Sequence, residues 1–102
     1  MEIRFSNEAI TKILDQPMIY RWPCTAQICK NINELRSLFA YQAGCLNFTD
    51  TNKAVQKCIV EAVKSSHTEM EKCLEDTLCI GGWGMETYQM PEALMNRVLQ
   101  QN

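Results

Sequence analysis

The sequence predicts an all-α fold, a small bundle of four to five short helices stapled by three disulfides. Apolar residues recur at steps of three or four, which places them on one face of a helix. Proline and glycine fall between these segments, and six cysteines occur among 102 residues. An even number of cysteines in so short a chain is typical of a disulfide framework. The length fits a single domain, residues 1–102, whose cysteine-stapled core, 24–79, lies between cysteine-free N- and C-terminal helices.

The first helix is expected over residues 6–16. Its apolar side comprises Ile10, Ile13 and Leu14. Ser6 or Asn7 can cap it, because either side chain accepts a hydrogen bond from a free first-turn amide. Pro17 ends it, since proline cannot donate a backbone hydrogen bond. Residues 18–23, MIYRWP, then predict an extended, aromatic connector that lies on the core.

The second helix is expected to follow Thr25, which can cap it, and to end near Gly44. Its apolar face comprises Ile28, Ile32, Leu35 and Phe39. Glycine favours the left-handed conformation with which many helices end. A third helix is expected to begin at residues 49–51. Its apolar stripe comprises Ala54, Val55, Cys58, Ile59, Ala62 and Val63.

Ser65, Ser66 and His67 interrupt this apolar pattern. Ser66 with Glu69 has the form of a capping box, which predicts the start of a fourth helix. The apolar face of that helix comprises Met70, Cys73, Leu74 and Leu78. The glycine-rich residues 81–84 break the chain again. Pro91 suits the first turn of a final helix, with Leu94, Met95, Val98 and Leu99 on its buried side.

The predicted disulfides involve Cys24, Cys29, Cys45, Cys58, Cys73 and Cys79, which allow fifteen pairings. A helical hairpin turning at Ser66 favours Cys58–Cys73, Cys45–Cys79 and Cys24–Cys29. A rival set is nested: Cys24–Cys79, Cys29–Cys73 and Cys45–Cys58. Nesting of this kind resembles that of saposin-like helical domains, whose helices between cysteines are longer. The sequence alone leaves both sets open.

A secreted, extracellular location follows from the cysteines. Asn47, Phe48 and Thr49 form an N-glycosylation sequon, which predicts a glycoprotein with its sugar on Asn47. In this view Met1 is a start residue placed on a mature domain. The alternative is an intracellular protein with six reduced cysteines, which pack as small apolar residues.

Several function classes are disfavoured by composition and spacing. A net charge of −2, with the ten lysines and arginines scattered, argues against nucleic acid as a partner. No apolar run is long enough to span a membrane. The cysteine spacings do not match a zinc template, and His67 is the only histidine, so no metal or other cofactor is expected. His67 is predicted to be a solvated turn residue, and no set of catalytic residues is apparent.

Two groups of side chains are the candidates for binding a partner. The first comprises Tyr20, Arg21 and Trp22, and the second comprises Trp83, Met85, Tyr88 and Met90. Tyrosine, tryptophan and arginine are enriched among interface hot spots, and methionine adapts to irregular partners. The competing interpretation for both groups is ordinary packing in the core.

The sequence therefore predicts a non-enzymatic extracellular binding module that recognises a protein partner such as a receptor, a ligand or a cell surface. One alternative is a carrier of a small apolar ligand or lipid, with its helices forming a saposin-like clasp. A second is a secreted toxin- or hormone-like factor, and the last is an intracellular adaptor.

Overall fold

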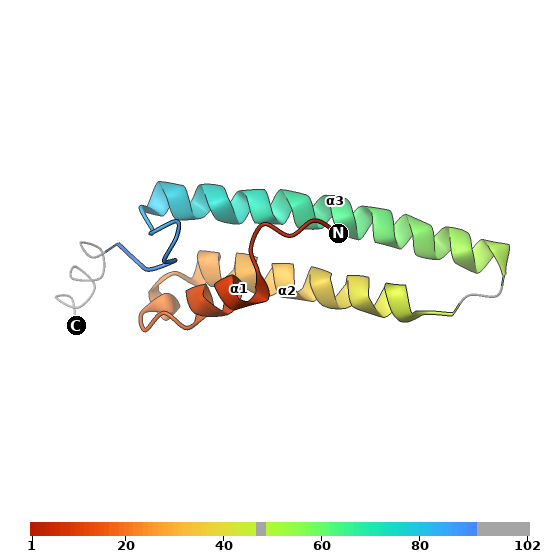
Figure 1. The fold of residues 1–102 in the computed structure, drawn as a ribbon, viewed down its shortest axis with the longest axis horizontal. Coiled ribbons are helices and arrows are strands. Elements are labelled where there is room, and N and C mark those ends of the chain that lie inside the picture. The colour runs from red at the N-terminus through yellow and green to blue at the C-terminus, as the bar shows by residue number, and fades with distance from the viewer. Residues whose placement is uncertain (47–48, 92–102) are drawn as a thin grey trace.

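A computed structural model describes residues 1–46 and 49–91 of the chain, and within these residues it is all-α, as predicted. The elements are α1 (Asn7–Leu14), the 3-10 turn η1 (Ile19–Arg21), α2 (Pro23–Gly44) and α3 (Asp50–Gly81). Helices α2 and α3 form a long antiparallel hairpin, and α1 lies against α2 near the open end of that hairpin (Figure 1).

Three α-helices are present among the described residues, fewer than the four to five expected. The difference comes mainly from α3, which joins the predicted third and fourth helices into one. The final helix predicted from Pro91 onward lies, after Pro91 itself, outside the described residues, as does the sequon residue Asn47.

Helix α1 confirms the first predicted helix and its cap. The Ser6 hydroxyl oxygen accepts a hydrogen bond from the backbone N–H of Ala9 at 3.0 Å. The helix gives way at Asp15, just before Pro17. The connector that follows is not extended as predicted, because η1 winds its centre into one 3-10 turn.

Helix α2 begins at Pro23, two residues before its predicted cap Thr25. Proline is tolerated there because the first helical N–H groups have no partner within the helix. Thr25, the predicted cap, is instead a buried residue of the first turn, with 2% of its surface exposed. Helix α2 ends at Gly44, as predicted, but the predicted left-handed conformation there is wrong, because Gly44 has no positive φ and the chain continues into the extended backbone of Cys45.

Helix α3 continues through Ser65, Ser66 and His67, so the predicted break and capping box are wrong. Thr49 caps its start by accepting a hydrogen bond from the N–H of Asn52 at 3.1 Å. At its other end Gly82 adopts a φ of 76°, and the N–H of Trp83 donates to the carbonyl of Leu78 at 2.9 Å. This pattern is a Schellman C-cap, which glycine permits because it lacks a Cβ.

The continuous α3 also overturns the hairpin-based disulfide set. Cys58 and Cys73 lie on one helix, where fifteen residues at 1.5 Å each separate them by about 22 Å. Cys45 and Cys79 lie at opposite ends of the hairpin. Disulfides need Cα atoms within about 7 Å. All six cysteines are thiols here, with no two at bonding distance, and three disulfides stay a prediction.

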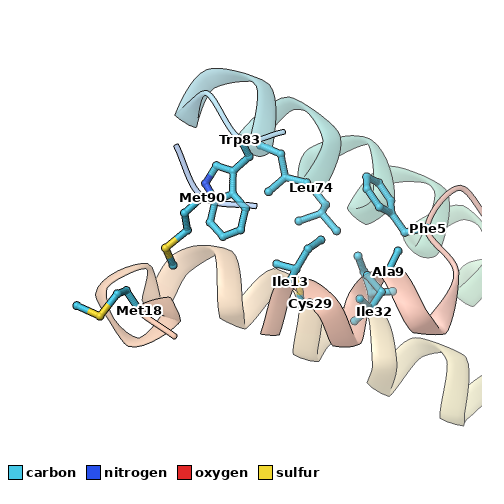
Figure 2. Packing of buried hydrophobic residues seen from close by; sticks show 11 residues of the cluster. Phe5, Ala9, Ile13, Met18, Cys29, Ile32, Leu74, Trp83 and Met90 are labelled. Carbon is cyan, nitrogen blue, oxygen red and sulfur yellow. The ribbon is translucent and has the colours of Figure 1, made fainter. Parts of the chain in front are cut away.

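The core lies between α1, α2 and the second half of α3, and the loop after α3 adds to it (Figure 2). Its buried members are Phe5, Ala9, Ile10, Ile13, Met18, Cys29, Ile32, Leu74, Leu78, Trp83 and Met90. The outer end of the hairpin, around the first two turns of α3, contributes none of them. The packed half of the molecule is therefore the half that carries α1 and the aromatic segments.

Replacing Leu78 with alanine tests this core. Leu78 is fully buried, so we expect the free energy of unfolding to fall by about 2–5 kcal/mol, measured by urea denaturation. Ile80→Ala, two residues along α3, is the matched control, because Ile80 is 88% exposed. Its effect should stay within about 0.5 kcal/mol. Equal losses in both variants would contradict the placement of Leu78 on the buried face of α3 and of Ile80 on its exposed face.

Candidate functional site

The two predicted groups of aromatic residues meet at the open end of the hairpin. Trp22 immediately precedes α2, and Trp83 follows the end of α3. Because the two helices run antiparallel, these ends lie together, and the ring centroids of Trp22 and Trp83 are 6.0 Å apart at 78°. This edge-to-face arrangement is one that aromatic pairs prefer. The hairpin thus joins two segments that are 61 positions apart in the sequence.

The candidate residues at this end divide into exposed and buried ones. Tyr20 is 62% exposed and Met85 is 39% exposed, so both are available to a partner. Trp83 and Met90 are buried in the core, so neither side chain is exposed to a partner in this structure. Trp22 and Tyr88 are half-buried and pack against the core, while Arg21 is exposed. We call Tyr20, Arg21 and Met85, backed by Trp22 and Trp83, the aromatic end.

Local contacts hold the exposed members of the aromatic end. The Arg21 guanidinium carbon lies 5.4 Å from the centre of the Tyr20 ring, a cation–π contact. The Met85 sulfur lies 3.7 Å from the Sγ of Cys79. Both exposed side chains therefore rest on neighbouring groups.

The loop after α3 returns the chain to the core. The N–H of Tyr88 donates to the carbonyl of Gly84 at 2.8 Å, and the N–H of Gly84 donates to the carbonyl of Gln89 at 3.0 Å. Tyr88 adopts a φ of 56°, uncommon for a residue with a side chain, and its ring lies 5.8 Å from that of Phe5. This closed loop seats Met90 in the core and leaves Met85 outside.

Ile80 is not among the candidate contact residues predicted from the sequence, although it is 88% exposed beside this end. The helical period of the apolar residues in α3 could have indicated its exposure. Leu74 and Leu78 share the buried side of α3, and a residue two positions after Leu78 is rotated well away from it. An apolar residue so placed points to solvent.

A second cluster, made of polar residues and partly buried, lies in the middle of the hairpin around Arg36 of α2. Its Nε donates to the Nε2 of His67 at 3.0 Å, and its Nη1 donates to the Oδ1 of Asn7 at 2.7 Å. Its Nη2 lies 3.3 Å from a carboxylate oxygen of Glu71 and also donates to the carbonyl of Phe5. One guanidinium thus joins α1, α2, α3 and the N-terminal segment.

Glu71 anchors the N-terminal segment to α3. Its Oε2 accepts hydrogen bonds from the backbone N–H of Arg4 at 2.7 Å and of Phe5 at 2.8 Å. Its Oε1 lies 3.3 Å from His67 Nδ1, which lacks a well-aligned hydrogen bond. Glu71 is 3% exposed, and a buried carboxylate needs such partners to remain charged.

His67 is fully buried, so its prediction as a solvated turn residue is wrong. Burial lowers the pKa of His67 below its ordinary value of 6.5. The Glu71 carboxylate opposes this shift, and the Arg36 guanidinium adds to it. Because His67 accepts a hydrogen bond from Arg36 through Nε2, the neutral imidazole carries its proton on Nδ1. Because His67 is buried and contacts Arg36 of the other helix, we infer that its role is to stabilise the packing of α2 against α3.

The cysteines differ sharply in their surroundings. Cys29 is fully buried, and burial raises the pKa of its thiol to about 11. Cys45 is half-buried, and the other four thiols are exposed. Among residues 1–46 and 49–91, no group of three or more histidine, cysteine, aspartate or glutamate side chains is placed to hold a metal ion. No helix in the described part of the chain is long and apolar enough to cross a membrane.

Glu71→Ala tests the buried cluster. The variant leaves Arg36 and two backbone N–H groups without their carboxylate, so we expect a loss of about 3 kcal/mol in the free energy of unfolding. Glu75→Ala is the matched control, since Glu75 pairs with Arg4 at 2.8 Å on the exposed surface. We expect a loss of at most about 1 kcal/mol for it. A Glu75 effect as large as that of Glu71 would contradict the assignment.

The depressed pKa of His67 predicts acid sensitivity. In the unfolded chain the imidazole takes up a proton near pH 6.5, while the folded chain keeps it neutral to lower pH. The unfolded state then binds more protons, so stability should fall as the pH drops below 6.5 and should be fully present above it. Urea denaturation between about pH 8 and pH 5 measures this, above the range in which most carboxylates titrate.

His67→Gln is the control for this pH dependence, because its amide oxygen can accept from Arg36 without titrating. The difference in stability between the native chain and this variant should narrow as the pH falls. A difference that stays constant over the range would show that His67 does not carry the effect.

No protein-family model, curated protein or solved structure significantly matches this chain. The function must therefore be argued from the geometry of its own residues. Of the two clusters, the buried one has its polar groups turned inward, and the aromatic end presents large side chains to the outside. The aromatic end is the candidate functional site.

Proposed function

We propose that this chain is a secreted, non-enzymatic binding module, stapled by three disulfides, that recognises a protein partner through the aromatic end. The observation that carries the proposal is the meeting of two separate aromatic segments at one end of the hairpin. There Tyr20 and Met85 stand exposed beside the contact between Trp22 and Trp83.

The chemistry of these residues suits a protein partner. Tyrosine and arginine combine large contact area with directional polar groups, and they dominate binding energy at many interfaces. Arg21 lies over the Tyr20 ring, and Met85 contacts Cys79, so both exposed side chains are already partly ordered. A partly ordered surface loses less conformational entropy when a partner binds.

The proposed extracellular location rests on the cysteines and on the sequon at Asn47. Four thiols are exposed, and exposed thiols in an oxidising compartment form disulfides. A glycan on Asn47 would lie between the end of α2 and the start of α3, at the opposite end of the hairpin from Trp22 and Trp83. Glycosylation there would leave the aromatic end accessible.

The carrier hypothesis has less support from the described surface. The hollow along α1 is open and is lined by polar residues, namely Asn7, Glu8, Thr11, Lys12, Asp15 and Gln16. A groove beside Ile28 and Met70 also contains amide side chains. Carriers of apolar ligands favour enclosed, mostly apolar pockets. A toxin- or hormone-like factor would also act by binding a protein, and its activity on cells would distinguish it.

Binding of the tagged, secreted chain to a panel of cell types tests the proposal. The probe is multimerised and detected by flow cytometry, on intact cells and on cells whose surface proteins have been removed with trypsin. We expect binding that trypsin abolishes. Tyr20→Ala should weaken it about tenfold, the effect of losing one hot-spot contact.

Tyr41→Ala is the matched control, because Tyr41 is 71% exposed but lies near the other end of α2. It should bind as the native chain does. Equal weakening by both tyrosine variants would exclude the aromatic end as the contact surface. Binding that survives trypsin and is reproduced by protein-free lipid vesicles would favour the carrier instead.

A further inference from the structure

The contacts between α2 and α3 fix which residues of the two helices lie at the same level. Arg36 meets His67 at 3.0 Å in the middle, and Trp22 meets Trp83 at the open end. Toward the closed end the Gln56 side chain donates to the carbonyl of Gln42, a contact that spans five residues beyond the register of Arg36 and His67. Since the helices are antiparallel, each step back along α2 from Arg36 matches one step forward along α3 from His67.

The six cysteines fall on matching levels of this hairpin. Cys24 lies twelve residues before Arg36, and Cys79 lies twelve residues after His67. Cys29 lies seven residues before Arg36, and Cys73 six after His67. Cys45 lies nine residues after Arg36, and Cys58 nine before His67. At a rise of about 1.5 Å per residue, each pair is level to within about one residue.

We propose that the oxidised protein carries the nested disulfides Cys24–Cys79, Cys29–Cys73 and Cys45–Cys58, dictated by the register of the α2–α3 hairpin. This inference rests on the disulfides of the proposed function and selects one pairing out of fifteen. Each bridge joins two sulfurs as both thiols lose a proton and an electron. Oxidised glutathione accepts them and leaves as two reduced glutathione molecules.

Two of these bridges lie where the backbone is least constrained. Cys24 is in the first turn of α2, and Cys79 is in the last turn of α3, just before Gly81 and Gly82. Cys45 follows the end of α2 in an extended conformation, and its partner Cys58 is an exposed residue in the third turn of α3. Helix ends open at little cost in free energy, so these thiols can turn toward each other.

The middle bridge demands more of the structure. Cys29 is fully buried against α3, but Cys73 is exposed, and its direction differs by about 100° from that of the buried Leu74 next to it. Joining Cys29 to Cys73 therefore requires α3 to rotate locally about its axis. Such a rotation does not change the positions of the cysteines along the hairpin. Packing of Leu74 and Leu78 opposes this turn, and the buried Cys29 thiol ionises poorly. Cys29–Cys73 should therefore close last.

Peptide mapping of the full chain from a secretory host tests the pairing. After free thiols are alkylated, trypsin should release residues 37–53 joined to 58–64 by Cys45–Cys58. It should also release residues 22–30 joined to 73–97 by two bridges. Cleavage after Glu75 separates Cys73 from Cys79, and fragmentation of the products shows which cysteine each one holds. Any other pairing, or Cys29 and Cys73 left as thiols, would overturn the proposal.

Oxidation of the reduced chain with oxidised glutathione tests the order. The first stable species should lack four hydrogens, with Cys29 and Cys73 still open to alkylation after unfolding. The final species should lack all six. An intermediate in which Cys29 is already bridged would overturn the argument from burial.

Paired variants give a second readout. The double variant Cys24→Ser with Cys79→Ser should keep two bridges and no free thiol. The mismatched double variant Cys24→Ser with Cys73→Ser should leave Cys29 and Cys79 as thiols, and a mismatched variant with no thiols would contradict the register. Six free thiols in the native secreted chain would overturn the stapled module as well as the pairing. Binding that Tyr20→Ala leaves unchanged would overturn only the proposed partner surface.

Discussion

The fold depends on one largely enclosed guanidinium, that of Arg36. It reaches from α2 to His67 and Glu71 on α3, and Glu71 in turn holds the backbone of the N-terminal segment. Apolar side chains tolerate small shifts between packed helices, but a buried charge that loses its partner is costly. A slide of one helical turn between α2 and α3 would separate these groups. The polar cluster therefore sets the register that the apolar core by itself would leave less certain.

The positions of the side chains at the open end of the hairpin follow from this register. With Arg36 level with His67, the start of α2 lies beside the end of α3, and Trp22 reaches Trp83. The Schellman cap at Gly82 then turns the chain back, so that Met85 remains outside while Met90 enters the core. The aromatic end is thus a consequence of helix lengths, of one glycine cap and of a contact made in the middle of the hairpin.

Local signals in the sequence were sufficient for the helical class, for the Ser6 cap of α1 and for the end of α2 at Gly44. They failed at Ser65, Ser66 and His67, where serines resembling a cap suggested a break. The helix continues because His67 has its partner Arg36 31 residues away, and no local pattern reveals such a contact. Similarly, the sequence singled out Tyr20 and Trp83 alike, since exposed and buried aromatic residues look the same until the fold places them.

The nested disulfides and the aromatic end are physically linked. Cys24 lies four residues after Tyr20, and Cys79 already contacts the Met85 sulfur at 3.7 Å. A bridge between Cys24 and Cys79 would tie together the two backbone segments that carry the exposed contact residues. By restricting the unfolded and partly open states, it would hold Tyr20 and Met85 in a fixed relation before any partner arrives. The disulfide at the open end would then serve recognition as well as stability, while the two inner pairs serve mainly to hold the hairpin closed.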